Sequence, residues 1–367
     1  IDVGGTFTDV VAADTDGKVT IGKVPSIPHD EGQAVLNGIK SLHISPEDVE
    51  RLVHGTTVGT NAVIQRQGSK IAFITTYGFK DILEIGKSKR MIPGTMFKPF
   101  FVRPKPVVPR SRCFEIKERT LYDGQIFRPV DNDDVRGVCQ IIKDEGVEAV
   151  AICFLHSYAN PSNEEEVANI IRDVLGNIPI SISSKVVPEY REFERYSTTV
   201  LNAYIQPLVQ NYLFGLHKTL ADSGYTLGVL TIASSGGFMT LDTAVDFPVQ
   251  SILSGPAGGV VQCNYISERL GFENVITYDM GGTSTDVCLI KSYTPVVATD
   301  NLVGGFPLKI PQIDINTVGA GGGSIAWTDL DGALQVGPNS AGAAPGPACY
   351  DKGGTEPTVT DANLILN

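Results

Sequence analysis

The sequence predicts a protein built from two α/β domains, and two observations lead to this prediction. Near its start the chain reads Asp2-Val3-Gly4-Gly5-Thr6-Phe7-Thr8-Asp9-Val10, and 277 residues later it reads Asp279-Met280-Gly281-Gly282-Thr283-Ser284-Thr285-Asp286-Val287. Seven of the nine positions are identical, which indicates two structurally equivalent halves. Each copy also opens a series of strands followed by alternating helices and strands, the order typical of α/β domains. We place the domains at 1–190 and 191–367.

The predicted elements of the first domain follow from apolar spacing. They are three strands within 1–24, helices at 30–43 and 46–52, a short helix ending at Gly68, a strand at 70–75, a helix at 133–145, a strand at 147–155, a helix at 162–175 and a strand at 178–184. The run 147–155 is almost entirely apolar, as expected for a central parallel strand. Residues 91–112 are rich in proline and predict an extended excursion.

The second domain begins with a long helical pattern at 192–223, which Pro207 should kink or divide. A strand at 227–233 and a helix from Ser254 to about Gly271 precede the second copy of the repeat. That copy predicts a hairpin with strands at 275–278 and 287–290, and another strand is expected at 324–330. Residues 337–363 are dense in glycine, proline and alanine and show little periodicity. Both ends of the chain look trimmed, and we expect the second domain to be incomplete at its C-terminal end.

Composition restricts the possible functions. The chain has 367 residues, 42% of them hydrophobic and 19% charged, as in ordinary globular proteins. A formal charge of −12 argues against binding to nucleic acid or to an anionic membrane. No apolar run approaches the roughly 18 residues of a membrane span, so we expect a cytoplasmic protein. The six cysteines are scattered, and Cys153 and Cys288 are expected to be buried and reduced.

The paired Gly-Gly-Thr turns predict a phosphate site. Two glycines let a bulky anion reach backbone N–H groups, and the threonines would add hydroxyl donors. The residues expected to hold phosphate are Gly4, Gly5, Thr6, Thr8, Gly281, Gly282, Thr283 and Thr285. Asp2 and Asp279 would lie close to the same phosphates, which requires a cation between them; Mg²⁺, or Mn²⁺ in its place, suits that geometry. The alternative, good turn chemistry alone, explains one copy better than two matched copies.

Other nucleotide motifs are absent or weak. Gly86-Lys87-Ser88 ends like a P-loop, but Asp81 stands where its first glycine is required. The segment around Gly319, Gly321 and Gly322 fits a dinucleotide fingerprint poorly, because a strand and not a helix is expected to follow. Two interpretations stay open for Gly321 and Gly322, a close approach to an adenosine and a purely structural turn. Ser235 is a poor nucleophile candidate because the first glycine of a nucleophile elbow is missing.

Several further polar residues allow two interpretations. Asp9 and Asp286 either orient their own hairpins through turn N–H groups or act in catalysis by orienting the attacking group. His54, Thr56, Thr57 and Asn61 either contact a substrate or form a helix-capping network. Glu84, Lys87 and Arg90 form either a charged rim for a substrate or partner or, more simply, a solvated surface. No histidine spacing suggests a zinc site.

The paired motifs resemble the two phosphate hairpins of the actin, sugar-kinase and Hsp70 ATPase superfamily. The chain is more specifically similar to the A-type subunit of the ATP-dependent hydantoinase/5-oxoprolinase family. The similarity extends over nearly the whole chain, through residues 1–9, 54–62, 78–86, 192–204, 254–259 and 337–363. Gly59 and Ser235 depart from the family pattern, in which alanine and asparagine are usual. Family A-type subunits are much longer than this chain.

This resemblance implies two ribonuclease H-like (actin-like ATPase) domains with a nucleotide cleft between them. It implies an ATP-dependent hydrolase subunit that activates a cyclic amide, such as a hydantoin, 5-oxoproline or a lactam, for ring opening. Relatives in the family include ketone carboxylases, so a ketone substrate is the first alternative. ATP and Mg²⁺ are the implied cofactors, and a B-type partner subunit or fused domain, in a hetero-oligomer, is the implied partner.

Two further functions compete with this one. A small-molecule kinase of the same superfamily would release its phosphorylated product, and an Hsp70- or actin-like module would use ATP to move its domains. The segments at 54–62, 78–86 and 337–363 favour the amide-activating enzyme. ATP turnover that depends on a small cyclic amide or ketone would separate the enzyme from a chaperone, which responds to peptide.

Overall fold

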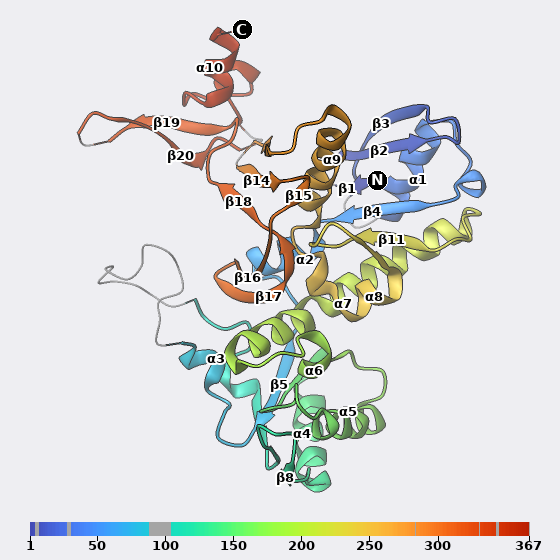
Figure 1. Ribbon diagram of the computed structural model, residues 1–367, viewed down its shortest axis with the longest axis vertical. Coiled ribbons are helices and arrows are strands. Elements are labelled where there is room, and N and C mark those ends of the chain that lie inside the picture. Colours follow the sequence, from blue (N-terminus) through green and yellow to red (C-terminus); the bar gives the residue numbers. More distant parts are fainter. Residues whose placement is uncertain are drawn as a thin grey trace. The chain divides into compact units, whose positions relative to one another are not determined.

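The computed structural model describes residues 1–3, 7–27, 31–87, 104–282, 284–329, 331–342 and 345–366. Its contacts divide the chain into two compact units, one of Ile1–Gly255 with Thr299–Pro311 and the other of Pro256–Ala298 with Gln312–Asn367. Figure 1 shows the path of the chain through both. This division by contacts differs from the predicted boundary near residue 190, because a long helix that starts at Glu192 packs inside the first unit.

The first unit contains a mixed six-stranded sheet that carries the first copy of the repeat. Its order is β12-β11-β4-β1-β2-β3, with bounds Phe238–Thr240, Val229–Ile232, Leu52–Thr56, Asp2–Val3, Phe7–Ala13 and Val19–Pro25. Strands β1, β2 and β3 form an antiparallel meander; β4 pairs with β1 in parallel, and β11 pairs with β4 in parallel. Helix α1 (Glu31–Ser41) covers one face, where its Val35, Leu36 and Ile39 pack on Val3 and Leu52. The predicted meander is confirmed.

A second sheet of the first unit is entirely parallel. Its order is β10-β9-β5-β6, with bounds Ile180–Ile182, Ala149–Cys153, Ile71–Thr76 and Cys113–Ile116. Every residue of β9 is buried, since helices α4 (Asn132–Asp144) and α5 (Ser162–Leu175) cover one face and α7 (Glu192–Asp222) the other. The predicted central parallel strand is confirmed. A capping bond from Asp133 N to Asp131 Oδ1 (3.0 Å) fixes the start of α4.

Helix α7 links the two sheets of the first unit (Figure 1). Its first half packs on β9 and β10, and its last turns join the core beneath α1 through Leu216 and Leu220. The helix continues through Pro207, so of the two predicted effects the division is wrong, and the kink stays a prediction. Every residue from Glu194 to Gln206 is buried, and this packing compensates for the backbone hydrogen bond that Pro207 cannot donate.

Shorter elements complete the first unit. They are η1 (Pro46–Asp48), α2 (Val58–Ile64), α3 (Ile82–Ile85), η2 (Arg110–Arg112), β7 (Arg119–Thr120), β8 (Ile126–Arg128), α6 (Ser183–Val186), α8 (Leu241–Asp246), η3 (Pro248–Ser251), and most of β16 (Val297–Val303) and β17 (Phe306–Ile313). The helix predicted at 46–52 is only the short turn η1, because the chain must extend again to form β4. Of the excursion predicted at 91–112, residues 91–103 lie outside the described part.

The second unit carries the second copy of the repeat. Strands β13 (Val275–Met280), β14 (Thr285–Lys291) and β15 (Thr294–Pro295) form an antiparallel meander, and β18 (Ile315–Val318) pairs with the other edge of β14. Helix α9 (Ser254–Leu270) covers one face with Ala257 and Val260 against Cys288 and Ile290. The remaining elements are β19 (Ser324–Thr328), β20 (Leu334–Ser340), η4 (Ala348–Tyr350) and α10 (Val359–Leu366).

Two general expectations can be compared with this structure. All six cysteines are free, and Cys153 and Cys288 are buried, as predicted. Burial raises the pKa of both thiols, which keeps them protonated and unreactive. None of the helices in the described ranges combines the length and the apolar character that crossing a membrane requires.

Candidate phosphate hairpins

The sequence repeat is also a structural repeat. In the first unit Asp2 lies opposite Asp9 and Val3 opposite Thr8; in the second unit Asp279 lies opposite Asp286 and Met280 opposite Thr285. The two pairings are related by the same 277-residue offset that relates the sequences. Each hairpin thus places two carboxylates side by side on adjacent strands at the base of its glycine turn, where like charges repel unless a cation lies near.

Burial of equivalent residues also agrees between the copies. Asp2 and Asp279 are exposed, whereas Thr8 and Thr285 are buried. The Thr8 hydroxyl lies 3.0 Å from Ser26 Oγ, and the Thr285 hydroxyl donates to the carbonyl of Ala320 at 2.5 Å. These two hydroxyls were expected to donate to phosphate. Both hydroxyls are buried and bonded within the protein, and a contact of either one with phosphate stays a prediction.

In the first hairpin one carboxylate is neutralised within the sheet. Lys23 lies opposite Asp9 on β3, and its Nζ is 2.9 Å from Asp9 Oδ1. Asp2 lies over Gly55 of β4, where a Cβ atom would be 3.2 Å from Asp2 Oδ1. Although Asp2 is exposed, partial desolvation of its carboxyl group by the neighbouring strands raises its pKa. The N-terminal amine lowers this pKa, and the charge of Asp9 raises it to a smaller extent.

In the second hairpin, no lysine or arginine among the described residues takes the place of Lys23. Thr317 lies opposite Asp286 on β18, and its hydroxyl donates to Asp286 Oδ1 at 2.6 Å. A neutral hydroxyl orients the carboxylate without cancelling its charge. Within the described residues, Asp279 has no ion-pair or hydrogen-bond partner. The second hairpin therefore holds two uncompensated carboxylates, whereas the first holds two carboxylates and one lysine.

The aspartate carboxylates of the hairpins suit a cation that is held partly through water better than one that is held by protein atoms alone. In the part of the chain that the structure describes, no three side chains of His, Cys, Asp or Glu converge as a metal site. Mg²⁺ keeps several waters and takes one or two carboxylates, so a facing aspartate pair is compatible with it. Gly4, Gly5, Thr6 and Thr283, which were predicted to contact phosphate, lie outside the described residues.

The glycine-rich loop at 319–323 packs against the second hairpin. The N–H groups of Gly322 and Gly323 donate to the carbonyls of Gly281 and Gly282 at 2.9 and 2.7 Å. Gly321 N donates to Ser324 Oγ at 2.8 Å. The backbone donors of Gly321 and Gly322 are thus engaged within the protein, which supports the structural interpretation of this loop. A role of these glycines in approaching an adenosine stays a prediction.

The polar residues at 54–61 do not form one site. His54 is fully buried and its Nε2 lies 2.5 Å from the hydroxyl of Tyr212 on α7; burial lowers its pKa to about 3. Thr56 is also buried, and its hydroxyl accepts from Val58 N at 3.2 Å. Thr57 and Asn61 are exposed and lie 3.3 Å apart through their side chains. His54 is therefore a core residue.

The charged residues near 84–90 are only partly described. Lys87 forms an ion pair with Glu194 on α7, so it serves the first unit internally. Glu84 is exposed, and Arg90 lies outside the described residues. This geometry does not favour a substrate role for Lys87.

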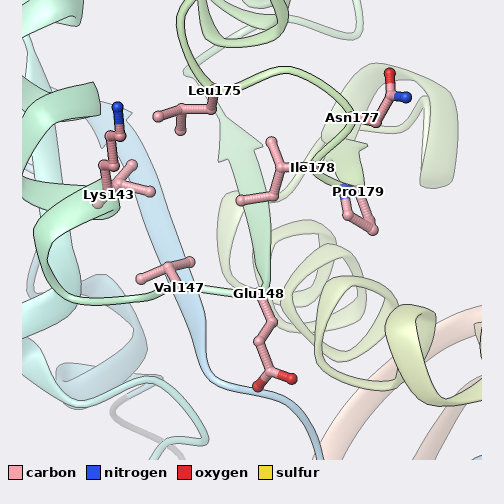
Figure 2. Close-up of a pocket in the computed structure, with 8 residues that line it drawn as sticks. Lys143, Val147, Glu148, Leu175, Asn177, Ile178 and Pro179 are labelled. Atoms are coloured by element: carbon pink, nitrogen blue, oxygen red, sulfur yellow. The ribbon is translucent and has the colours of Figure 1, made fainter.

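Figure 2 shows a surface hollow of the first unit that is separate from both hairpins. It is lined by Ile142, Lys143, Val147, Glu148, Leu175, Asn177, Ile178 and Pro179. These residues precede or flank the amino ends of β9 and β10. Ligands of parallel sheets usually bind at the carboxyl ends, and none of the predicted site residues lines this hollow.

Sequence reasoning missed the residues that surround the aspartates. Lys23 could have been found by continuing the predicted meander, because antiparallel register places it opposite Asp9. Gly55 and Thr317 belong to strands that pair with the hairpins from a distance in sequence, and no local signal marks them. Both depend on which strand becomes the neighbour.

Two family models match this chain. The hydantoinase/oxoprolinase N-terminal region matches residues 1–175, and the hydantoinase/oxoprolinase model matches residues 195–367. The alpha subunit of caprolactamase from Pseudomonas jessenii is 38% identical over 374 residues, which span the whole chain and 54% of that subunit. The gamma subunit of acetophenone carboxylase from Aromatoleum aromaticum is 36% identical and is covered to 52%.

Solved structures give the same picture. The crystal structure of the ATP-dependent caprolactamase from Pseudomonas jessenii matches with a TM-score of 0.88 at 37% identity, over 99% of this chain and 54% of that one. A nucleotide-free acetone carboxylase structure matches with a TM-score of 0.81 at 29% identity, over 100% of this chain and 54% of that one. The mixed α/β fold is thus shared, and the chain spans about half the length of these relatives.

Proposed function

The chain belongs to the hydantoinase/oxoprolinase family, and we propose that it is the ATP-handling part of an enzyme that opens a cyclic amide. The observation that carries this proposal is the pair of hairpins with the same register, Asp2 opposite Asp9 and Asp279 opposite Asp286. The likeness to an ATP-dependent caprolactamase supports both the use of ATP and the class of bond. Names of other relatives include 5-oxoprolinase, which fits the same class.

We further propose that both units are ribonuclease H-like domains of the actin-like type. In the first unit, the meander β1–β3 followed by parallel β4 and β11 supports this. In the second unit, the meander β13–β15 with the repeated register supports it. A nucleotide cleft between the two domains, and a domain boundary near residue 190, stay predictions.

The proposed chemistry is phosphoryl transfer to the amide oxygen. The γ-phosphorus of ATP forms a bond to that oxygen and its bond to the β-phosphate oxygen breaks, so ADP leaves. Water then attacks the activated imidate-like carbon, and the ring C–N bond breaks as the nitrogen takes a proton and leaves, which gives an acyl phosphate. A second water attacks this acyl phosphate, and inorganic phosphate leaves from the resulting carboxylate. Catalysis of such transfers is mainly positioning and charge neutralisation.

The hairpin residues have distinct proposed parts in this reaction. The turn glycines Gly4, Gly5, Gly281 and Gly282, with Thr6 and Thr283, hold the β- and γ-phosphates. Asp2 and Asp279 hold Mg²⁺ through water, and this ion would neutralise phosphate charge when bound. The uncompensated pair Asp279 and Asp286 makes the second hairpin the stronger cation site, since Lys23 offsets one charge in the first.

A second candidate reaction is ATP-dependent carboxylation of a ketone. The structural match to acetone carboxylase and the sequence match to acetophenone carboxylase favour it. The same hairpins would serve, because either substrate oxygen can accept a phosphoryl group. Several relatives are named as subunits, which supports a partner of the B type, either a separate chain or a fused domain.

Phosphate release by the full-length protein, with and without its B-type partner, would test the proposal. ATP would be supplied with hydantoins, 5-oxoproline, lactams, or ketones with and without bicarbonate. Release that depends on one cyclic amide supports the amide-opening enzyme, and release that depends on a ketone with bicarbonate supports the carboxylase. Phosphate release that does not depend on any of these compounds but increases with peptide would contradict both enzyme proposals and indicate an ATP-driven binding module.

A further inference from the structure

The glycine-rich loop at 319–323 forms hydrogen bonds to the turn of the second hairpin, in the same unit. Gly322 N–H and Gly323 N–H donate to the carbonyls of Gly281 and Gly282 at 2.9 and 2.7 Å. A Cβ atom on Gly323 would lie 2.9 Å from the Gly282 carbonyl oxygen, so the two backbones touch. Both carbonyls of the Gly-Gly turn are therefore fixed by one loop.

Fixing these carbonyls also fixes a donor that faces the other way. The peptide joining Gly281 to Gly282 is planar and trans, so its N–H points opposite to its C=O. Because the Gly281 carbonyl is bonded to Gly322, the N–H of Gly282 is directed away from the loop. Gly282 is exposed, so this N–H is presented on the outer side of the turn.

The loop is in turn held by Thr360, in the first turn of α10. The Thr360 N–H and hydroxyl both donate to the Gly322 carbonyl, each at 2.8 Å. That carbonyl belongs to the same peptide whose N–H, on Gly323, donates to Gly282. A Cβ atom on Gly322 would lie 2.9 Å from Thr360 Oγ1, so the contact leaves no room for a side chain.

Thr360 itself is immobilised by a capping box. Thr358 N and Thr358 Oγ1 donate to Asp361 Oδ2 at 2.8 and 2.7 Å, and Asp361 N donates back to Thr358 Oγ1 at 3.3 Å. Ala326 N also donates to the Pro357 carbonyl at 2.8 Å, which attaches this segment to β19. Figure 1 shows α10 beside the β19–β20 hairpin.

We propose that Thr360 is a positioning residue for the phosphate-binding turn at Gly281–Gly282. A chain of hydrogen bonds runs from Thr360 through the Gly322–Gly323 peptide to the Gly282 carbonyl. By fixing Gly322, the same contact holds the Gly322 N–H on the Gly281 carbonyl, which keeps the Gly282 N–H aimed at the phosphate. Hydrogen bonds linked in this way polarise one another. In this role Thr360 acts through the loop and not by contact with ATP or substrate. This inference rests on the proposed function, because it assumes that this turn binds ATP phosphate.

The test compares MgATP binding and turnover in four versions of the full-length protein with its partner. Thr360→Val removes the hydroxyl while keeping the side-chain volume and the backbone N–H. Thr360→Ser restores the hydroxyl. Thr294→Val is the matched control, since it removes a hydroxyl bonded to a backbone carbonyl, that of Ser292 at 3.4 Å, elsewhere in the unit.

A hydrogen bond of this kind contributes about 1 kcal/mol, which corresponds to roughly fivefold in an equilibrium constant. We expect Thr360→Val to weaken MgATP binding about fivefold and to raise the KM for ATP in proportion, with a melting temperature that falls by only a few degrees. Thr360→Ser and Thr294→Val should bind as the wild type does. Wild-type affinity in Thr360→Val, or an equal loss in Thr360→Ser, overturns the inference.

Two further results separate this inference from the proposed function. A wild-type protein that does not bind MgATP at all contradicts the proposed function, whatever the variants do. If Thr360→Val fails to fold, Gly322→Ala tests the same contact from the loop side, because its methyl group pushes against Thr360 Oγ1. A folded Gly322→Ala protein with wild-type affinity for MgATP then overturns the inference, and a loss of fivefold or more supports it.

Discussion

Asp9 and Asp286 occupy equivalent positions of the two hairpins but have different neighbours on the adjoining strand. Lys23 lies beside Asp9, whereas Thr317 donates a hydrogen bond to Asp286. Both copies of the repeat thus keep the carboxylate, but only the first copy has a neighbouring positive charge that compensates it. The prediction that both act in catalysis stays a prediction, and the charge difference favours Asp286.

Removal of the Asp279 carboxylate should abolish ATP-dependent turnover and leave the fold intact. Asp279→Ala removes an exposed side chain that lies opposite Asp286, so stability should change by no more than about 0.5 kcal/mol. Phosphate release measured beside a thermal melt checks both expectations. Asp331→Ala, at another exposed aspartate of the same unit, is the control and should keep wild-type turnover. Undiminished turnover in Asp279→Ala would contradict the assignment of this hairpin.

His54 makes stability depend on pH. Burial lowers its pKa to about 3 in the folded protein, against an ordinary value of 6.5. Below pH 6.5 the His54 imidazole therefore binds a proton in the unfolded chain but not in the folded chain. The free energy of unfolding falls as the pH drops below 6.5. Urea unfolding should show about 1.4 kcal/mol more loss between pH 7.5 and pH 5.5 in the wild type than in His54→Gln. Equal losses in the two proteins would show that His54 is accessible to protons.

At the scale of elements, α1 packs closely on the first hairpin. A Cβ atom on Gly38 would lie 2.4 Å from Val10 Cγ2, so α1 rests directly on β2. Glycine lowers helix propensity, yet here it sets the distance between helix and sheet. The sequence pattern predicted α1 but gave no sign of this contact.

Gly38→Ala should destabilise the protein by about 1–3 kcal/mol, because the added methyl group forces α1 away from β2. Gly137→Ala is the matched control, since Gly137 lies within α4 and a Cβ there meets nothing within 4 Å. That variant should gain about 0.5–1 kcal/mol from helix propensity. Chemical denaturation of both variants checks the pair; a similar change in each would mean that packing on Val10 does not decide the outcome.

At the scale of the whole molecule, each compact unit carries one hairpin, and α7 is the element that unites the two sheets of the first unit. Its fully buried Arg195 donates to the carbonyls of Phe154 and Glu189 at 2.7 and 3.0 Å, which ties the start of the helix to the parallel sheet. The contacts of α7 explain why the chain divides by contacts at Gly255 and not near residue 190.

MgATP should stabilise the chain if the hairpins bind its phosphates. A ligand present at 100 times its dissociation constant adds about 2.7 kcal/mol to stability, so the melting temperature should rise in proportion to the logarithm of MgATP concentration. Asp279→Ala should reduce this rise, and so should removal of the metal with a chelator. A melting temperature that does not change when MgATP is added to millimolar concentration would contradict nucleotide binding by this chain.

The sequence by itself determined the repeat, the meanders that carry it, the buried strand β9, the buried free thiols and the family. These features depend on turn chemistry and on apolar spacing, which act over a few residues. Only the tertiary structure decided that Thr8 and Thr285 are buried, that His54 belongs to the core, that Lys23 and Thr317 distinguish the two hairpins, and that the glycine loop and Thr360 support the second turn. Each of these depends on which distant segment becomes a neighbour, and pairing between distant segments leaves no local pattern in the chain.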